Sequence, residues 1–234
     1  MAPELITLIP KVESSHQPSS VQMQPRTGLP FNLTNAQQVT LVFALIMIAV
    51  WTPQGRVNTI VSLLAAFCIV WFTIGSHYSV RELGLVRPVS GVAPILAVGA
   101  LMVTAMVVAG TLMDDLGPAH PVPWKRAWQY AIWSLQQEFI LQSFFFVRLE
   151  SVLGGRRAAV RGALLFSIAH IPNPVLTVLS FTGGLVFCEL FRRYHNLFPL
   201  GVVHAAVGLT IAASLPHSLL HHMRVGLGYL LYRP

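Results

Sequence analysis

The sequence is poor in charged residues. Only 10% of its 234 residues are Asp, Glu, Lys or Arg, whereas 54% are hydrophobic, and the mean hydropathy is +0.65. Soluble domains carry about 25% charged residues. This shortage excludes an ordinary soluble domain and indicates an integral membrane protein that crosses the bilayer several times. We expect it in the inner or plasma membrane of a cell.

Cysteine is scarce as well. The two cysteines, Cys68 and Cys188, both lie in apolar runs, so we interpret them as small hydrophobic side chains and not as a disulfide framework or a metal site. The net charge of +7 comes from 15 basic against 8 acidic residues. The arginines gather at the ends of apolar runs, with no basic stripe that contains aromatics. We therefore expect no nucleic-acid partner.

The chain divides into a polar tail, an apolar bundle and a short C-terminal tail. Residues 1–37 are rich in Ser, Gln and Pro and are expected to be disordered. Residues 38–215 are expected to form an all-α membrane bundle. Residues 216–234 carry His and Arg among leucines and are expected at the membrane interface. The expected spans lie at about 38–51, 58–76, 91–112, 124–147, 158–172, 174–192 and 197–215.

The basic residues predict how the seven spans are oriented. With the N-terminus in the cytoplasm, ten basic residues fall on the cytoplasmic side and five on the other. No internal repeat is evident, which weakens an inverted-repeat transporter reading. The ten expected cytoplasmic residues are Lys11, Arg26, Arg81, Arg87, Arg148, Arg156, Arg157, Arg161, Arg192 and Arg193.

Three ionisable residues lie in apolar segments. Glu138 is mid-way along AIWSLQQEFILQSFFFV, His170 ends GALLFSIAH, and His204 lies inside LFPLGVVHAAVGLTIAASL. An ionisable group in hydrocarbon costs roughly 2.5 kcal/mol or more, so such a group usually faces a cavity and has a function. Three such residues on three separate segments indicate one shared site.

Helical spacing adds neighbours to these three residues. Ser134, Glu138 and Gln142 fall at i, i+4 and i+8 and share one face of a helix. Gln137 lies about 100° to one side of Glu138. Phe166 is one turn before His170, and Gly208 is one turn after His204.

These stretches resemble the membrane protease family of the CAAX-processing and bacteriocin-processing proteins. That family has Glu-Glu-x-x-x-Arg, Phe-x-x-x-His and His-x-x-x-Asn on successive membrane helices. The resemblance covers about residues 90–215 and implies a seven-helix bundle with its motifs in the second half. The corresponding stretches in this chain are Gln137-Glu138-x-x-x-Gln142, Phe166-x-x-x-His170 and His204-x-x-x-Gly208.

The resemblance implies an intramembrane endopeptidase that needs no cofactor. Its partners would be membrane lipid and a peptide or membrane-protein substrate. Glu138 and His170 would activate water, and His204 would stabilise the oxyanion. The chain departs from the family pattern at three positions. Gln137 replaces the Glu that usually serves as general base, Gln142 replaces the Arg, and Gly208 replaces the Asn.

Two alternatives stay open. Because the amide of Gln137 takes no proton near neutral pH, the chain can be a catalytically altered family member that acts as a membrane scaffold or regulator. Alternatively, Glu138, His170 and His204 supply one carboxylate and two imidazoles. Those groups suffice to bind zinc or another divalent metal in a membrane enzyme of lipid or isoprenoid chemistry.

The other clusters have structural interpretations. Glu189 and Arg193 are spaced for a surface ion pair. The phenylalanines at 144–146 are expected to face lipid or to pack against other helices. Arg156, Arg157 and Arg161 are expected to set the topology and to meet anionic lipid headgroups.

Overall fold

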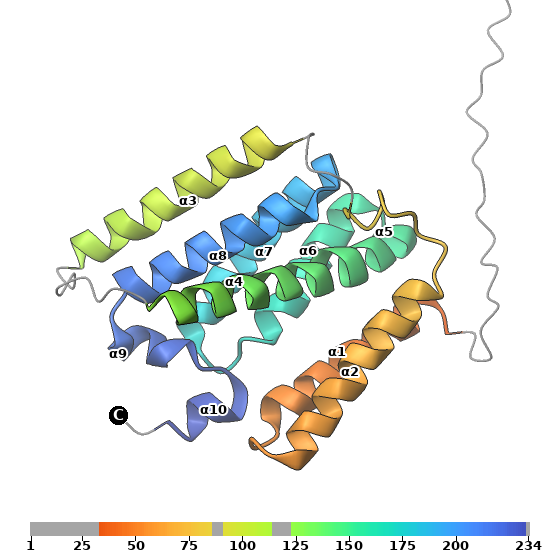
Figure 1. Ribbon diagram of the computed structural model, residues 1–234, viewed down its shortest axis with the longest axis horizontal. Coiled ribbons are helices and arrows are strands. Elements are labelled where there is room, and N and C mark those ends of the chain that lie inside the picture. Colours follow the sequence, from red (N-terminus) through yellow and green to blue (C-terminus); the bar gives the residue numbers. More distant parts are fainter. Residues whose placement is uncertain (1–32, 86–90, 114–122, 233–234) are drawn as a thin grey trace, which may run out of the picture.

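The computed structural model describes residues 33–85, 91–113 and 123–232. These ranges contain helices and turns and no strand, which confirms the all-α prediction. Figure 1 shows α1 and α2 side by side as a hairpin next to the other helices. In chain order the helices are α1 (Asn35–Trp51), α2 (Arg56–Ile74), α3 (Val92–Leu112), α4 (Trp124–Glu138), the π-helix η1 (Phe139–Phe146), α5 (Val147–Leu153), α6 (Gly155–Ile168), α7 (Pro174–Tyr194), α8 (Leu197–Ser214), α9 (His217–Leu220), the 3-10 turn η2 (His221–Met223) and α10 (Gly226–Leu230).

Each of the seven expected apolar segments contains a helix. In the part of the chain that the structure describes, α2, α3, α7 and α8 are long and apolar enough to cross a membrane, and α1 is apolar but shorter. The chain is thus an integral membrane protein with four candidate spanning helices. The full count of seven spans and the cytoplasmic N-terminus stay predictions.

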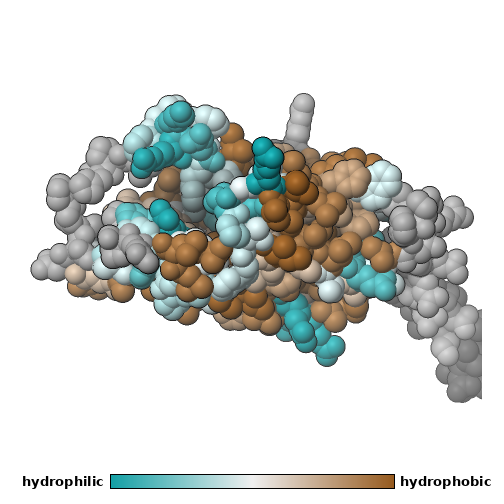
Figure 2. All heavy atoms as spheres, turned by 90° about the horizontal axis from the view of Figure 1, so that it is seen from below, coloured by the Kyte–Doolittle hydropathy of each residue, from teal (hydrophilic) through white to brown (hydrophobic). Residues whose placement is uncertain are grey.

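Large apolar side chains cover much of the outer surface. Ile60 and Leu63 on α2 are 64% and 65% exposed, and Leu101 on α3 is 70% exposed. Figure 2 shows extended hydrophobic areas between smaller polar patches on the face in view. Apolar surface of this extent is stable against lipid tails and costly in water.

The first helix begins slightly earlier than the sequence predicts. Thr34 accepts a hydrogen bond from the backbone N–H of Gln37, and the Gln37 side chain accepts one from the backbone N–H of Thr34. This capping box starts α1 at Asn35. Of the tail expected over residues 1–37, residues 1–32 lie outside the described residues.

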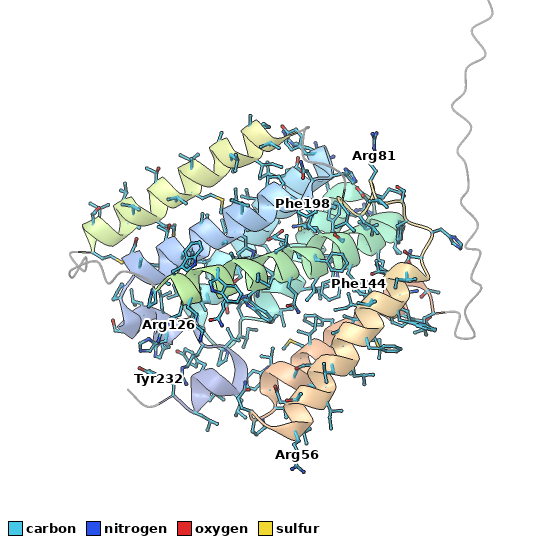
Figure 3. All side chains as sticks on the ribbon, in the orientation of Figure 1. Arg56, Arg81, Arg126, Phe144, Phe198 and Tyr232 are labelled. Carbon is cyan, nitrogen blue, oxygen red and sulfur yellow. The ribbon has the colours of Figure 1, made fainter. Side chains whose placement is uncertain are left out.

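The phenylalanine run packs between two hydrophobic cores. Phe144 and Phe145 join the core of the α1–α2 hairpin, whereas Phe146 joins the core formed with α6, α7 and α8. The label in Figure 3 marks Phe144 beside the hairpin. All three rings are buried, so this run is packing surface. The segment η1 therefore joins the hairpin to the rest of the bundle.

The C-terminal tail consists of short helical turns that pack against the bundle. Leu220 is fully buried, and the backbone N–H of Gly226 donates to the carbonyl of Ile171 over 2.9 Å. Asn173 Nδ2 donates to the carbonyls of Leu220 (2.8 Å) and Arg224 (3.2 Å). Position 173 thus holds the tail against the turn that follows His170. The interfacial placement of the tail stays a prediction.

Candidate functional site

Glu138 and His204 form a buried pair between α4 and α8. Glu138 is the last residue of α4 and is fully buried, and His204 is 9% exposed. Their Oε1 and Nδ1 atoms are 2.8 Å apart. A carboxylate at this distance fixes the orientation of the imidazole and leaves Nε2 as the nitrogen available to other groups.

The other oxygen of Glu138 also has a partner. Gln142 Nε2 donates to Glu138 Oε2 over 3.0 Å, as the predicted spacing of one turn requires. Both carboxylate oxygens are therefore engaged by side chains. The Gln142 Oε1 atom is buried and accepts no hydrogen bond from any described residue.

The helix widens immediately after Glu138. Residues Phe139–Phe146 form a π-helix, in which the backbone N–H of Val147 donates to the carbonyl of Gln142. The sequence pattern predicts one helical span over about 124–147 and does not distinguish a π-helix within it. π-turns inside α-helices occur frequently at functional sites. In this chain the π-turn lies next to the buried carboxylate.

Two glycines on α8 allow α4 to approach closely. A Cβ added at Gly201 would lie 2.7 Å from Leu135 Cδ1, and one added at Gly208 would collide with the hydroxyl of Tyr130. His204 lies between these glycines in sequence, so its short hydrogen bond to Glu138 depends on both. Tyr130 is one turn before Ser134, which is fully buried. Sequence reasoning places Ser134 on the polar face but misses Tyr130.

His170 lies in the turn after α6, next to His204 across one aromatic ring. Its Nδ1 is 2.7 Å from the carbonyl oxygen of Phe166. A carbonyl only accepts, so Nδ1 carries the proton and Nε2 carries the lone pair in the neutral ring. The Phe166 ring centroid is 4.7 Å from that of His170 and 5.8 Å from that of His204. Phe166 therefore contacts both imidazoles.

Gln137 has no polar contact with another described residue. It is half-buried beside Glu138, and its side chain forms no hydrogen bond with another described residue. The structure thus connects Glu138, Gln142 and His204 by hydrogen bonds, and Phe166 and His170 by ring contacts.

The metal-ligand alternative stays a prediction. Within the described ranges, no group of three or more His, Cys, Asp or Glu side chains is placed to hold a metal ion. Glu138 and His204 are paired with each other, while His170 is held by a backbone carbonyl.

Arg148 is a buried charged residue. Its expected place on the cytoplasmic side stays a prediction, and its side chain is fully buried. The guanidinium donates to Gln38 Oε1 (2.8 Å), to the carbonyl of Phe72 (2.9 Å) and to the carbonyl of Phe144 (3.2 Å). It also lies over the Phe144 ring at 3.9 Å. The Phe72 carbonyl is in the last turn of α2, where carbonyls lack helical partners.

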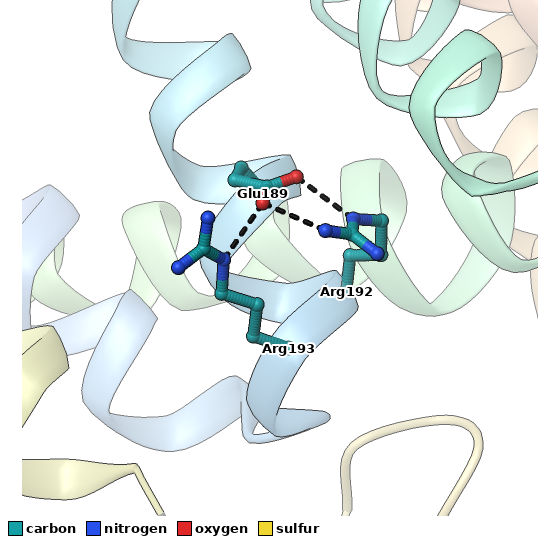
Figure 4. Close-up of polar contacts among 3 residues, drawn as sticks. All are labelled: Glu189, Arg192 and Arg193. Atoms are coloured by element: carbon teal, nitrogen blue, oxygen red, sulfur yellow. Dashed lines mark hydrogen bonds and ion pairs between the residues drawn. The ribbon is translucent and has the colours of Figure 1, made fainter.

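The expected surface ion pair is confirmed and is larger than predicted. Arg193 Nε lies 2.7 Å from Glu189 Oε1, and Arg192 Nε lies 2.8 Å from Glu189 Oε2 (Figure 4). Because both arginines are partly exposed, this cluster is separate from the buried pair of Glu138 and His204.

Comparison with known proteins supports the resemblance seen in the motifs. No curated protein and no solved structure matches the chain. Residues 121–210 match the family model described as type II CAAX prenyl endopeptidase Rce1-like. The matched segment contains Glu138, His170 and His204. In residues 121–210 the chain is therefore similar to the type II CAAX prenyl endopeptidase Rce1-like family, in agreement with the order of its motifs.

Proposed function

We propose that the chain is an intramembrane endopeptidase that hydrolyses a peptide bond at or within the membrane. The observation that carries this proposal is the buried hydrogen bond of 2.8 Å between Glu138 and His204. A histidine oriented by a carboxylate, with a second histidine nearby, is suited to acid–base chemistry at a carbonyl group.

His170 is the proposed base. Its Nδ1 is held by the Phe166 carbonyl at 2.7 Å, so the lone pair of Nε2 is free to take a proton from water. The water oxygen then forms a bond to the carbonyl carbon of the substrate, and the carbonyl oxygen becomes an oxyanion. When the C–N bond breaks, the proton passes from His170 to the leaving amine.

His204 is the proposed stabiliser of the oxyanion. The Glu138 carboxylate at Nδ1 stabilises the positively charged ring, and Nε2–H then donates to the oxyanion. Since both Glu138 oxygens are engaged, its proposed role is to orient His204 and not to bind the water. This assignment differs from the sequence-based expectation, in which Glu138 and His170 activate water together.

Tyr130 is a proposed second donor to the oxyanion. Its hydroxyl fills the space beside Gly208, one helical turn from His204. The family has an amide side chain at this position of α8, whereas this chain has none. A phenolic O–H supplies the same kind of neutral donor, so Tyr130 compensates for the missing side chain.

A second candidate function is a membrane scaffold or regulator without hydrolytic activity. The closed network of Gln142, Glu138 and His204 favours it, because a carboxylate with both oxygens engaged also stabilises helix packing. Gln137 in place of the general base of the family favours it too.

The two functions are separated by a cleavage assay. The full chain is purified in detergent and incubated with a prenylated CAAX peptide and with the same peptide lacking the prenyl group, and products are identified by mass spectrometry. We expect cleavage by the natural chain and at least a 100-fold loss in His170→Ala. His77→Ala removes an exposed imidazole and serves as the matched control. A fully active His170→Ala variant contradicts the protease proposal, and absence of cleavage of either peptide favours the scaffold.

A further inference from the structure

A basic surface pocket lies at the start of α6, away from the pair of Glu138 and His204. The pocket has a volume of about 440 Å³ and is lined by Leu153, Arg156, Arg157, Val160 and Arg161. All three arginines are exposed. Three positive side chains around one pocket create a positive potential that attracts anions.

The arginines of the basic pocket have no acidic partner in the described part of the chain. None of the three forms an ion pair or a hydrogen bond there, unlike Arg192 and Arg193, which both hold Glu189. The carboxylate of Glu150 on the preceding helix lies beside Gly155 and Arg192. The pocket is therefore left with uncompensated positive charge.

The pocket continues into an apolar helix face. Arg157, Val160, Arg161 and Leu164 are spaced i, i+3, i+4 and i+7, so they share one side of α6. Val160 is 50% exposed and Leu164 is 42% exposed. Positive charge therefore lies at the beginning of this face, and exposed aliphatic side chains continue along it. A soluble anion would contact only the arginines, whereas an amphiphile would contact the arginines and the exposed aliphatic side chains.

The backbone at the start of α6 favours an anion in the same place. The N-cap is Gly154, which has no side chain to accept a hydrogen bond from the first turn. The free N–H groups and the positive end of the helix dipole add to the charge of Arg156 and Arg157.

We propose that the basic pocket binds the phosphate headgroup of an anionic phospholipid, with its acyl chain along Val160 and Leu164. Four helices are long and apolar enough to cross a membrane, so a surface pocket of this chain can meet membrane lipid. The lipid would contact α6, the helix that ends just before His170. Binding here is independent of peptide hydrolysis.

The test compares lipids of different headgroup on the full chain in neutral detergent. Melting temperature and native mass spectrometry are measured with phosphatidylglycerol, with phosphatidylcholine and with soluble glycerol phosphate. We expect phosphatidylglycerol to bind and to raise the melting temperature, with weaker binding at high salt. Changing Arg156, Arg157 and Arg161 together to Gln should weaken this binding at least tenfold, since each basic residue at an anionic surface contributes roughly a factor of five.

A matched control removes the same charge elsewhere. The control variant replaces three exposed arginines that lie far apart on the molecule, by Arg56→Gln, Arg81→Gln and Arg126→Gln (Figure 3). This variant should keep its preference for phosphatidylglycerol. As a second probe, Val160→Glu adds a negative charge to the pocket and should also weaken binding. Equal binding by the natural chain and the pocket variants would overturn the proposal. Equal binding of glycerol phosphate and phosphatidylglycerol would overturn the lipid assignment.

Discussion

The hydroxyl of Tyr130 occupies the space that a side chain on Gly208 would need. This contact holds α4 and α8 at the separation at which Glu138 reaches His204. We predict that Gly208→Ala destabilises the protein by about 1–3 kcal/mol, because the added methyl group has no room. Denaturation in detergent measures the change. Gly228→Ala is the matched control, since an added Cβ there meets nothing within 4 Å.

A double variant tests whether the contact with Tyr130 causes the predicted loss of stability in Gly208→Ala. If the Tyr130 hydroxyl is the obstacle, Tyr130→Ala should recover part of the stability that Gly208→Ala loses when the two changes are combined. Strictly additive losses in the double variant would show that the two residues do not interact.

Glu138→Gln tests the role of the buried carboxylate. The amide keeps the size of the side chain but no longer stabilises a positive charge on His204, so we expect kcat to fall by about 100-fold or more. The melting temperature separates a catalytic loss from unfolding. Unchanged kcat in a folded Glu138→Gln variant would mean that Glu138 serves only to pack α4 against α8.

Arg148 should be essential for the stability of the α1–α2 hairpin. Arg148→Met leaves the carbonyls of Phe72 and Phe144 and the amide oxygen of Gln38 without their donor. We expect a loss of about 2–4 kcal/mol, measured by denaturation. Arg148→Lys should recover little, because one ammonium group cannot reproduce the planar guanidinium fork. Arg81→Met, which changes an exposed arginine, should have almost no effect.

Asn173 connects the His170 turn to the C-terminal tail. Its Oδ1 accepts from the backbone N–H of Leu176 and caps α7, while Nδ2 donates to the tail. Asn173→Asp keeps the cap acceptor but loses the donor. We expect faster hydrogen exchange of residues 216–232 in Asn173→Asp, and in addition about 1 kcal/mol of lost stability in Asn173→Ala. Unchanged exchange in both variants would contradict this role.

The helices and the meeting of two buried ionisable residues could be predicted from the sequence. Apolar runs determine where helices form, and an ionisable residue in such a run has to find a polar partner. Glu138 and His204 meet that requirement with each other. The spacing of one turn also predicted that Gln142 would lie beside Glu138, as it does.

The contacts made between distant helices could not be predicted in this way. Helical periodicity indicates which face of α8 carries Gly208, but not that Tyr130 of another helix fills the space beside it. For Arg148, the rule that basic residues mark the ends of membrane spans gives no sign that the side chain is buried. Acceptors such as the Phe72 carbonyl offset the cost of burying the guanidinium. This carbonyl belongs to α2, which is far from Arg148 in the sequence.

The π-helix has a consequence for how the chain tolerates insertions and deletions. A π-turn is geometrically equivalent to one extra residue accommodated within an α-helix, so the helical turns on either side keep the phase that they would have without that residue. Deleting one residue between Phe139 and Phe146 would let the segment relax to a plain α-helix. Because the wide turn would disappear together with the extra residue, Glu138 and Arg148 would keep their directions relative to one another. Between Glu138 and Arg148 the chain can therefore lose one residue and still direct the carboxylate into the site and the guanidinium into the hairpin.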